Sequence, residues 1–168
     1  GSEYNEWYGY ESGGLFQTAD EVANSPKLSN AVKAGDVKYL DLNGPDGVPD
    51  GKISPDYDRT LLGGSLPRFV FGSNIYFEYK GIDLSVVLQG VGKQNSRFSP
   101  EMIQPFVSTW TNVQKILDGN YWSVYNTEEE NLKAKYPRLA TQAATNNYIM
   151  SDFWMFNGQY LQIGRAHV

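Results

Sequence analysis

The clearest secondary-structure pattern in the chain runs from Arg68 to Gly92 and reads Arg-Phe-Val-Phe-Gly-Ser-Asn-Ile-Tyr-Phe-Glu-Tyr-Lys-Gly-Ile-Asp-Leu-Ser-Val-Val-Leu-Gln-Gly-Val-Gly. On both sides of Lys80-Gly81, large apolar residues alternate with small or polar ones. This period of two predicts two β-strands, and the Lys-Gly pair predicts a tight turn between them. The sequence therefore predicts an antiparallel hairpin from about Pro67 to Gly92.

The predicted hairpin has one apolar face and one polar face. The apolar set is Phe69, Phe71, Ile75, Phe77, Tyr79, Ile82, Leu84, Val86 and Leu88, and the polar set includes Asn74, Glu78, Asp83 and Gln89. A soluble protein would bury the apolar set in a core, whereas an outer-membrane protein would turn it toward lipid. Periodicity does not distinguish these two interpretations. The length of the two strands, close to the roughly 9–11 residues needed to cross a bilayer, slightly favours the membrane.

Composition narrows the function classes. The chain has 168 residues, with 14 Lys+Arg against 19 Asp+Glu and a formal net charge of −5, which argues against a nucleic-acid partner. No apolar run approaches the roughly 20 residues of a spanning helix, which excludes a helical membrane protein and leaves a β-barrel open. The chain has no Cys, which excludes disulfides and sites built on a thiol. Its single His, His167, is the second-last residue, which argues against a Ser-His-Asp triad.

An acidic loop, residues 41–58, precedes the hairpin. It resembles an EF-hand-type calcium loop, which needs oxygen ligands at alternate positions and a Gly at the sharp turn. The candidate ligands are Asp41, Asn43, Asp46, Asp50 and Asp58. The spacing is stretched by Gly44-Pro45 and Val48-Pro49, and no Glu stands at the bidentate end. The alternative is a turn-rich surface loop whose Asp side chains cap local backbone amides. We expect no cofactor other than calcium at this loop.

Carboxylate pairs such as Asp56/Asp58 and Glu128/Glu130 could suggest a glycosidase. Nothing flanking them would raise one pKa, and acidic loops contain such pairs by chance, so we expect no enzyme activity.

Four aromatic residues in the long polar stretch after the hairpin are candidates for contact with a ligand or partner: Trp110, Tyr121, Trp122 and Tyr125. Such rings can stack on a sugar or anchor a protein interface. Packing of the segment onto itself explains them equally well.

Several segments together resemble the C-terminal region of SusC/RagA-type TonB-linked outer-membrane transporters of Bacteroidetes. They are Tyr8–Thr18, Gly35–Asn43 leading to Asp58-Arg59-Thr60 and Gly63, the hairpin from Phe71 to Gly90, Tyr136-Pro137-Arg138-Leu139, Ser151–Trp154, and Gly158–Leu161. The resemblance extends over nearly the whole chain up to Leu161. We interpret Pro137 as fixing the chain and Arg138 as pairing locally.

The resemblance implies a barrel closed around a plug, driven by the TonB complex through parts outside this chain, and located in the outer membrane. It also implies a SusD-like surface lipoprotein as partner, an oligosaccharide or peptide as cargo, and membrane lipid around the strands. The expected fold class is all-β, a partial antiparallel transmembrane β-barrel with long extracellular loops containing short helices. The rival is a secreted soluble β-rich calcium- or glycan-binding module.

If Lys80-Gly81 is periplasmic, the topology assigns the remaining segments. Residues 1–66 form an extracellular region with a helix starting after Thr18, residues 67–92 the transmembrane hairpin, and residues 93–151 a long extracellular loop with a helix opening at Glu128. Residues 152–161 begin the next barrel strand, with Phe153 and Trp154 at membrane-facing positions. We expect residues 162–168 to be a non-native tail, because they lack strand alternation and ATC GGA AGA GCA CAC GTC, a common sequencing-adapter read-through, would encode 163–168.

Overall fold

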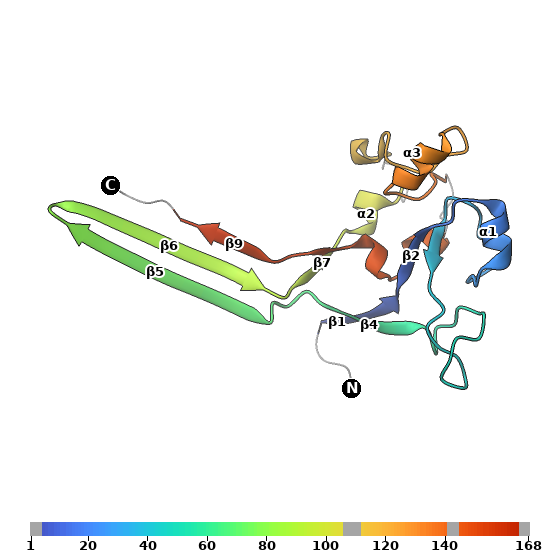
Figure 1. Ribbon diagram of the computed structural model, residues 1–168, viewed down its shortest axis with the longest axis horizontal. Coiled ribbons are helices and arrows are strands. Elements are labelled where there is room, and N and C mark those ends of the chain that lie inside the picture. The colour runs from blue at the N-terminus through green and yellow to red at the C-terminus, as the bar shows by residue number, and fades with distance from the viewer. Residues whose placement is uncertain (1–4, 106–111, 141–144, 165–168) are drawn as a thin grey trace. The chain divides into compact units, whose positions relative to one another are not determined.

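The computed structural model describes residues 5–105, 112–140 and 145–164. They divide into two compact units. The hairpin unit contains Gly63–Arg97 with the described parts of Gly1–Trp7 and Met155–Val168, and the loop unit contains Tyr8–Leu62 with the described parts of Phe98–Trp154. The structure is mainly β with a few short helices, as predicted, and its small sheets do not close into a barrel among the described residues (Figure 1). No helix in these ranges is long and apolar enough to span a bilayer.

The hairpin unit is built on β5 (Phe69–Tyr79) and β6 (Ile82–Gly92). The two strands pair antiparallel without a break, from Phe69 opposite Gly92 to Tyr79 opposite Ile82. Lys80 and Gly81 connect them with φ values of 50° and 83°, the pair of positive angles typical of a tight hairpin turn. The predicted strands and turn are therefore confirmed.

A third strand, β9 (Tyr160–Ile163), lies beside β6 and gives the sheet order β5-β6-β9 (Figure 1). Leu161 lies opposite Gly90, and Ile163 lies opposite Leu88. The expected tail at 162–168 therefore begins inside a strand, because residues 162 and 163 continue the pairing with β6. Residues 165–168, including His167, lie outside the described residues. Within the described ranges, β5 has β6 as its one strand partner.

The prediction of a strand beginning at Asp152 is wrong. Residues Asp152–Trp154 form a 3-10 turn, η2, and the chain then makes a separate short strand, β8 (Met155–Asn157). β8 pairs with β7 (Asn95–Arg97), which lies in the segment expected to be a loop. The physical reason is the burial of Trp154, which is 2% exposed rather than facing a membrane. A turn, unlike a strand, brings Phe153 and Trp154 together, with their rings 5.0 Å apart.

The loop unit contains one whole small sheet and parts of both strands of another. β2 (Ser12–Leu15) pairs antiparallel with β3 (Val37–Tyr39). β1 (Glu6–Tyr10) pairs with β4 (Arg59–Gly64), and the chain passes between the two units within both of these strands.

Short helices in the loop unit begin where the sequence supplies caps. Thr18 Oγ1 accepts a hydrogen bond from the Glu21 amide at the start of α1 (Ala19–Asn24), as predicted. Thr127 and Glu130 form a capping box at the start of α3 (Glu128–Lys133). The other helical elements are α2 (Pro100–Ile103), η1 (Lys115–Leu117) and α4 (Thr145–Tyr148).

The core of the loop unit consists of small apolar clusters. Two of them contain Tyr10, Val37, Tyr39 and Ile53, and Phe16, Val22 and Val32, respectively. A further aromatic cluster surrounds Trp154, which stacks on Tyr136 and Tyr148 at centroid distances of 5.9 and 5.8 Å. The Trp154 indole N–H donates to the Asn147 carbonyl at 2.7 Å, so this polar atom is paired inside the cluster.

A buried polar network centred on Asp36 connects distant parts of the loop unit. Asp36 is 1% exposed, and its carboxylate accepts from Arg138 Nε at 2.6 Å and from Asn147 Nδ2 at 3.0 Å. It also accepts from the Lys33 amide at 2.9 Å. The expected local pairing of Arg138 is therefore wrong, because its partner lies 102 residues away. A buried carboxylate needs this full set of donors, since an unpaired one would pay a large desolvation penalty.

We expect Asp36→Ala to lower the free energy of unfolding of the loop unit by roughly 2–4 kcal/mol. The substitution removes the hydrogen-bond acceptor of Arg138, Asn147 and the Lys33 amide. Native-state trypsin cleavage after Lys33 and Lys38 in the full-length protein measures local opening and should accelerate by at least about tenfold. The control is Asp20→Ala, which alters an exposed side chain on α1. Equal cleavage rates for both variants would contradict the role of Asp36.

Candidate functional site

The β5–β6 hairpin presents one continuous apolar face. Directly opposite residues share a face of an antiparallel sheet, and the register places Ile75 with Val86, Phe77 with Leu84, and Tyr79 with Ile82. We call this surface the apolar face; its members are Phe69, Phe71, Ile75, Phe77, Tyr79, Ile82, Leu84, Val86 and Leu88, joined by Leu161 and Ile163 of β9. All of β5 is exposed, with Phe69, Ile75 and Phe77 at 64%, 52% and 57%.

The opposite face is more polar, although not uniformly so. It carries Asn74, Glu78, Asp83, Ser85 and Gln89, together with Tyr76 and several valines. Glu78 and Asp83 lie opposite each other next to the turn. Two acidic side chains at adjacent positions favour a wet environment for this face. The apolar face therefore suits a nonpolar environment, and the opposite face suits water.

Gly90 leaves space on the apolar face for the ring of Phe71. A Cβ on Gly90 would collide with the ring of Phe71 on the neighbouring strand. The Phe71 ring therefore lies across Gly90, at a position where a larger residue would displace it. This arrangement provides a flat aromatic surface near the end of the sheet opposite the turn.

The length of the hairpin can be compared with a membrane. A strand of 11 residues at about 3.3 Å per residue is about 36 Å long, and at a tilt of about 45° it rises about 25 Å. The apolar band of outer-membrane barrels is about 25 Å tall. The apolar face is thus long enough to cover that band once.

In the acidic loop, Asp58 is the central residue. It is completely buried, and its carboxylate accepts hydrogen bonds from the amides of Leu42, Asn43 and Ser54 at 2.8, 3.1 and 2.6 Å. These contacts fasten the start of the loop to its end. Asp58 therefore acts as a backbone cap here, the alternative that sequence reasoning left open.

The other four candidate metal ligands divide into two groups. Asp41 Oδ2 accepts from the Gly51 amide at 2.6 Å, while Asp41 Oδ1 and Asn43 Oδ1 are buried and make no hydrogen bond. Asp50 caps the Lys52 amide at 2.9 Å, and Asp46 is exposed. Among the described residues there is no cluster of three or more His, Cys, Asp or Glu side chains arranged to hold a metal. Two unpaired oxygens fit a cation site in part, and calcium stays a prediction.

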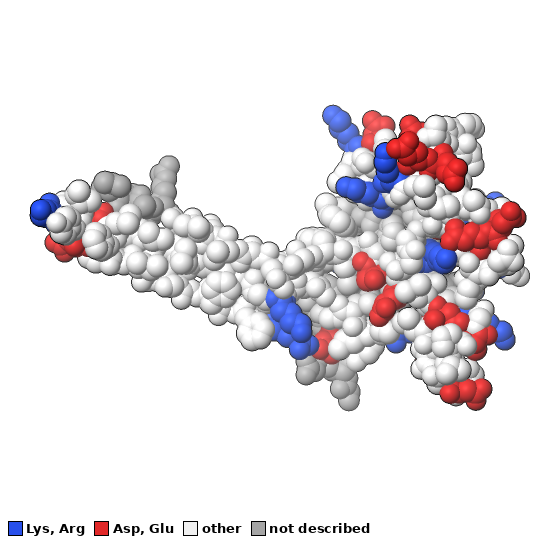
Figure 2. Space-filling model, viewed as in Figure 1, with Lys and Arg blue, Asp and Glu red and all other residues white. Residues whose placement is uncertain are grey.

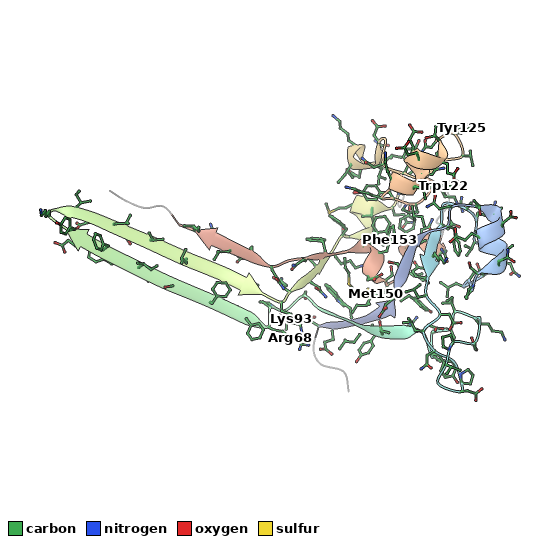
Figure 3. The ribbon with its side chains drawn as sticks, in the orientation of Figure 1. Arg68, Lys93, Trp122, Tyr125, Met150 and Phe153 are labelled. Atoms are coloured by element: carbon green, nitrogen blue, oxygen red, sulfur yellow. The ribbon has the colours of Figure 1, made fainter. Side chains whose placement is uncertain are left out.

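The candidate contact residues differ in accessibility (Figure 3). Tyr125 is 95% exposed and follows Val124 at 76%, whereas Trp122 is 6% exposed. Trp122 packs against Gly35, where any side chain would collide with the indole ring. Tyr121 is half-buried and bridges to Tyr136. Trp110 lies outside the described residues. The structure therefore presents Tyr125 outward and uses Trp122 within the loop unit.

The titratable groups with shifted pKa values do not favour acid–base chemistry at neutral pH. Burial raises the pKa of Tyr148 to about 12 and also raises the pKa of Tyr39. The hydrogen bond from Lys38 lowers the pKa of Glu21, and the Thr127 backbone lowers that of Glu130. All four shifts lead away from pH 7, where a general acid or base needs its pKa.

Two features of this region could not be read from the sequence. The Asp36–Arg138–Asn147 network joins residues more than 100 positions apart, and no local sequence motif predicts it. For Trp122 the sequence left packing open as an alternative but did not identify its partner, Gly35, whose positive φ of 85° and missing side chain leave space for the ring.

Comparison with known proteins gives one distant similarity. No family model matches the chain. A curated protein described as TonB-dependent receptor P3, from Formosa agariphila, is 24% identical over 164 residues, or 97% of this chain. The aligned region is 14% of that protein, so the chain spans about one seventh of its length. The chain is thus similar, along almost all its length, to a segment of a TonB-dependent receptor.

Proposed function

We propose that this chain is part of a TonB-dependent outer-membrane transporter in which the apolar face of β5–β6 contacts lipid. The observation that carries the proposal is the exposed apolar face itself, which extends along the whole paired length of β5 and β6 and is backed by acidic and amide side chains. The distant similarity to a TonB-dependent receptor supports it. In this function the strands belong to a barrel completed by other parts of a longer protein.

The finer assignment is also a proposal. We assign the transporter to the SusC/RagA type, with a SusD-like lipoprotein as lid, an oligosaccharide or peptide as cargo, and energy supplied by the TonB complex. The chain enters β5 and leaves β6 at the end opposite the Lys80-Gly81 turn. With that turn in the periplasm, residues 8–62 and 98–154 belong to the extracellular side. Tyr125, exposed on this side, is then a contact for the lid or the cargo.

A calcium ion in the acidic loop is a second, local proposal. It is supported by the buried Asp41 Oδ1 and Asn43 Oδ1, which make no hydrogen bond although buried polar atoms usually do. Oxygen atoms of this kind are the ligands that calcium prefers. The ion would hold the start of the acidic loop in addition to Asp58.

The lipid assignment predicts different sensitivity of the two hairpin faces. In the full-length protein, Ile75→Asp and Leu84→Asp should impair barrel assembly, at a cost of roughly 2–4 kcal/mol for a charge near the membrane midplane. Asn74→Asp, the neighbouring position on the opposite face, should be tolerated. Heat-modifiable electrophoretic mobility of outer-membrane fractions measures assembly. If Asn74→Asp is as harmful as Ile75→Asp, the lipid assignment is wrong.

The contact role of Tyr125 predicts that Tyr125→Ala weakens capture of the lid lipoprotein or lowers cargo uptake by the assembled transporter, because a large exposed ring is lost. Trp122→Ala is less informative, since Trp122 is buried and its loss would also disturb the loop unit. Glu129→Ala, an exposed position on α3, is the control. Unchanged capture and uptake in correctly assembled Tyr125→Ala would refute this role.

The calcium proposal predicts a heat of binding when the full-length protein is titrated with calcium in a calorimeter. Asp41→Ala should abolish the heat, because it removes an unpaired buried oxygen, while Asp46→Ala, at an exposed position, should retain it. Absence of heat in the wild-type protein would leave the acidic loop with its capping role alone.

A further inference from the structure

An open cavity of about 460 Å³ lies within the loop unit, with one side formed by α1. Its lining includes the buried side chains of Val22, Val32 and Trp122 and the exposed side chain of Val124. Most of the wall is therefore hydrocarbon. Small-molecule sites in proteins typically have volumes of about 300–1000 Å³ and mainly apolar walls with a few polar groups. The cavity has the size and the lining of such a site.

Two basic residues, Lys33 and Arg138, also line the cavity. The buried carboxylate of Asp36 holds both of them. It accepts hydrogen bonds from the Lys33 amide at 2.9 Å and from Arg138 Nε at 2.6 Å. The Asp36 amide also donates to the Lys33 carbonyl at 3.1 Å, which closes a tight turn. The two basic residues are thus anchored to one group beside the cavity.

The cavity has a surplus of one positive charge. Asp36 balances Arg138, whereas Lys33 is exposed and makes no ion pair with any residue that the structure describes. Among the described residues that line the cavity there is no acidic side chain, and Asp20 and Glu21 on α1 lie outside the lining. On the face of the loop unit that Figure 2 shows, by contrast, basic and acidic side chains are interspersed.

Arg138 keeps hydrogen-bond donors that a ligand can use. A guanidinium has five N–H groups, and Arg138 donates to Asp36 through Nε and Nη2, at 2.6 and 3.3 Å. Gly35 brings this side chain close to the aromatic wall, because a Cβ at Gly35 would collide with both the Trp122 ring and Arg138 Cβ. A cation and an aromatic surface therefore adjoin in one cavity.

From this arrangement we infer that the cavity binds a small organic carboxylate whose body is an aromatic or branched aliphatic group. One negative charge matches the surplus positive charge, and Lys33 and the remaining Arg138 donors would bind the carboxylate oxygens. The body of the ligand would replace water against Val22, Val32 and Trp122. A sugar suits the cavity less well, because its hydroxyl groups would lie against walls with few polar partners. The site belongs wholly to the loop unit and does not depend on the membrane assignment.

The test titrates the full-length protein in detergent with hydrocinnamate, and calorimetry measures the dissociation constant. We expect saturable binding to the wild type. Lys33→Gln should raise the dissociation constant about tenfold or more, because it removes the unbalanced charge. Lys135→Gln is the matched control, since Lys135 is also an exposed lysine of the loop unit and lies outside the cavity lining. It should bind as the wild type does.

A second variant tests the apolar wall without disturbing the core. Val124 is 76% exposed, so Val124→Asp leaves the buried clusters intact while adding a negative charge at the cavity. We expect it to raise the dissociation constant about tenfold or more, because like charges repel. Val48→Asp is the control, since Val48 is 60% exposed and lies outside the lining.

Three further probes identify the ligand chemistry. Hydrocinnamamide has the same body without the charge, acetate has the charge without the body, and neither should compete with hydrocinnamate. The peptide glycyl-glycyl-phenylalanine carries both groups at its C-terminus. Competition by this peptide would support the site with a peptide as the source of the carboxylate, and absence of competition would support it with a free acid as the source.

Three results would overturn the inference. They are the absence of hydrocinnamate binding to the wild type, equal binding by Lys33→Gln and Lys135→Gln, and competition by hydrocinnamamide as strong as that by unlabelled hydrocinnamate. Failure of barrel assembly in the hairpin variants would bear on the proposed function and leave this site unaffected.

Discussion

The register between β5 and β6 is the constraint on which the hairpin unit depends. Because Phe69 pairs with Gly92 and every following residue pairs in step, every Phe, Ile and Leu of both strands falls on one face. A shift of one residue in this register would mix them with Asn74, Glu78 and Asp83. Neighbouring strands inherit the same division, as Leu161 and Ile163 of β9 show. The composition of the exposed apolar face is therefore set by backbone pairing.

The loop unit is stabilised in a different way. Its apolar clusters are small, and two buried carboxylates organise the chain around them. Asp36 joins the segment before β3 to residues 138 and 147, and Asp58 joins the two ends of the acidic loop. Each carboxylate accepts several amide or guanidinium donors, which compensates for its removal from water. Long segments without regular secondary structure can hold a defined conformation by this means.

Sequence reasoning succeeded where the determining interactions are local. The hairpin and the helix start at Thr18 follow from patterns a few residues long, and both are present. It failed where the partner is remote: Arg138 looks like a local pairing residue until Asp36 is seen beside it. Asp152–Trp154 has the aromatic content of a strand, but the packing of Tyr136 and Tyr148 around Trp154 favours a turn. In the acidic loop, Asp side chains of the same sequence pattern can bind calcium or accept hydrogen bonds from backbone amides. Only the contacts in the structure distinguish these two roles.

The sheet order β5-β6-β9 has a consequence for handling the chain in water. Within the described residues β5 pairs on one side only, so 11 residues of backbone present their remaining donors and acceptors along an open edge, next to an exposed apolar surface. Such an edge is a template for another strand, including one from a second copy of the same chain. In water, an open edge beside an exposed apolar surface favours cross-β association, so we expect the segment handled alone to aggregate.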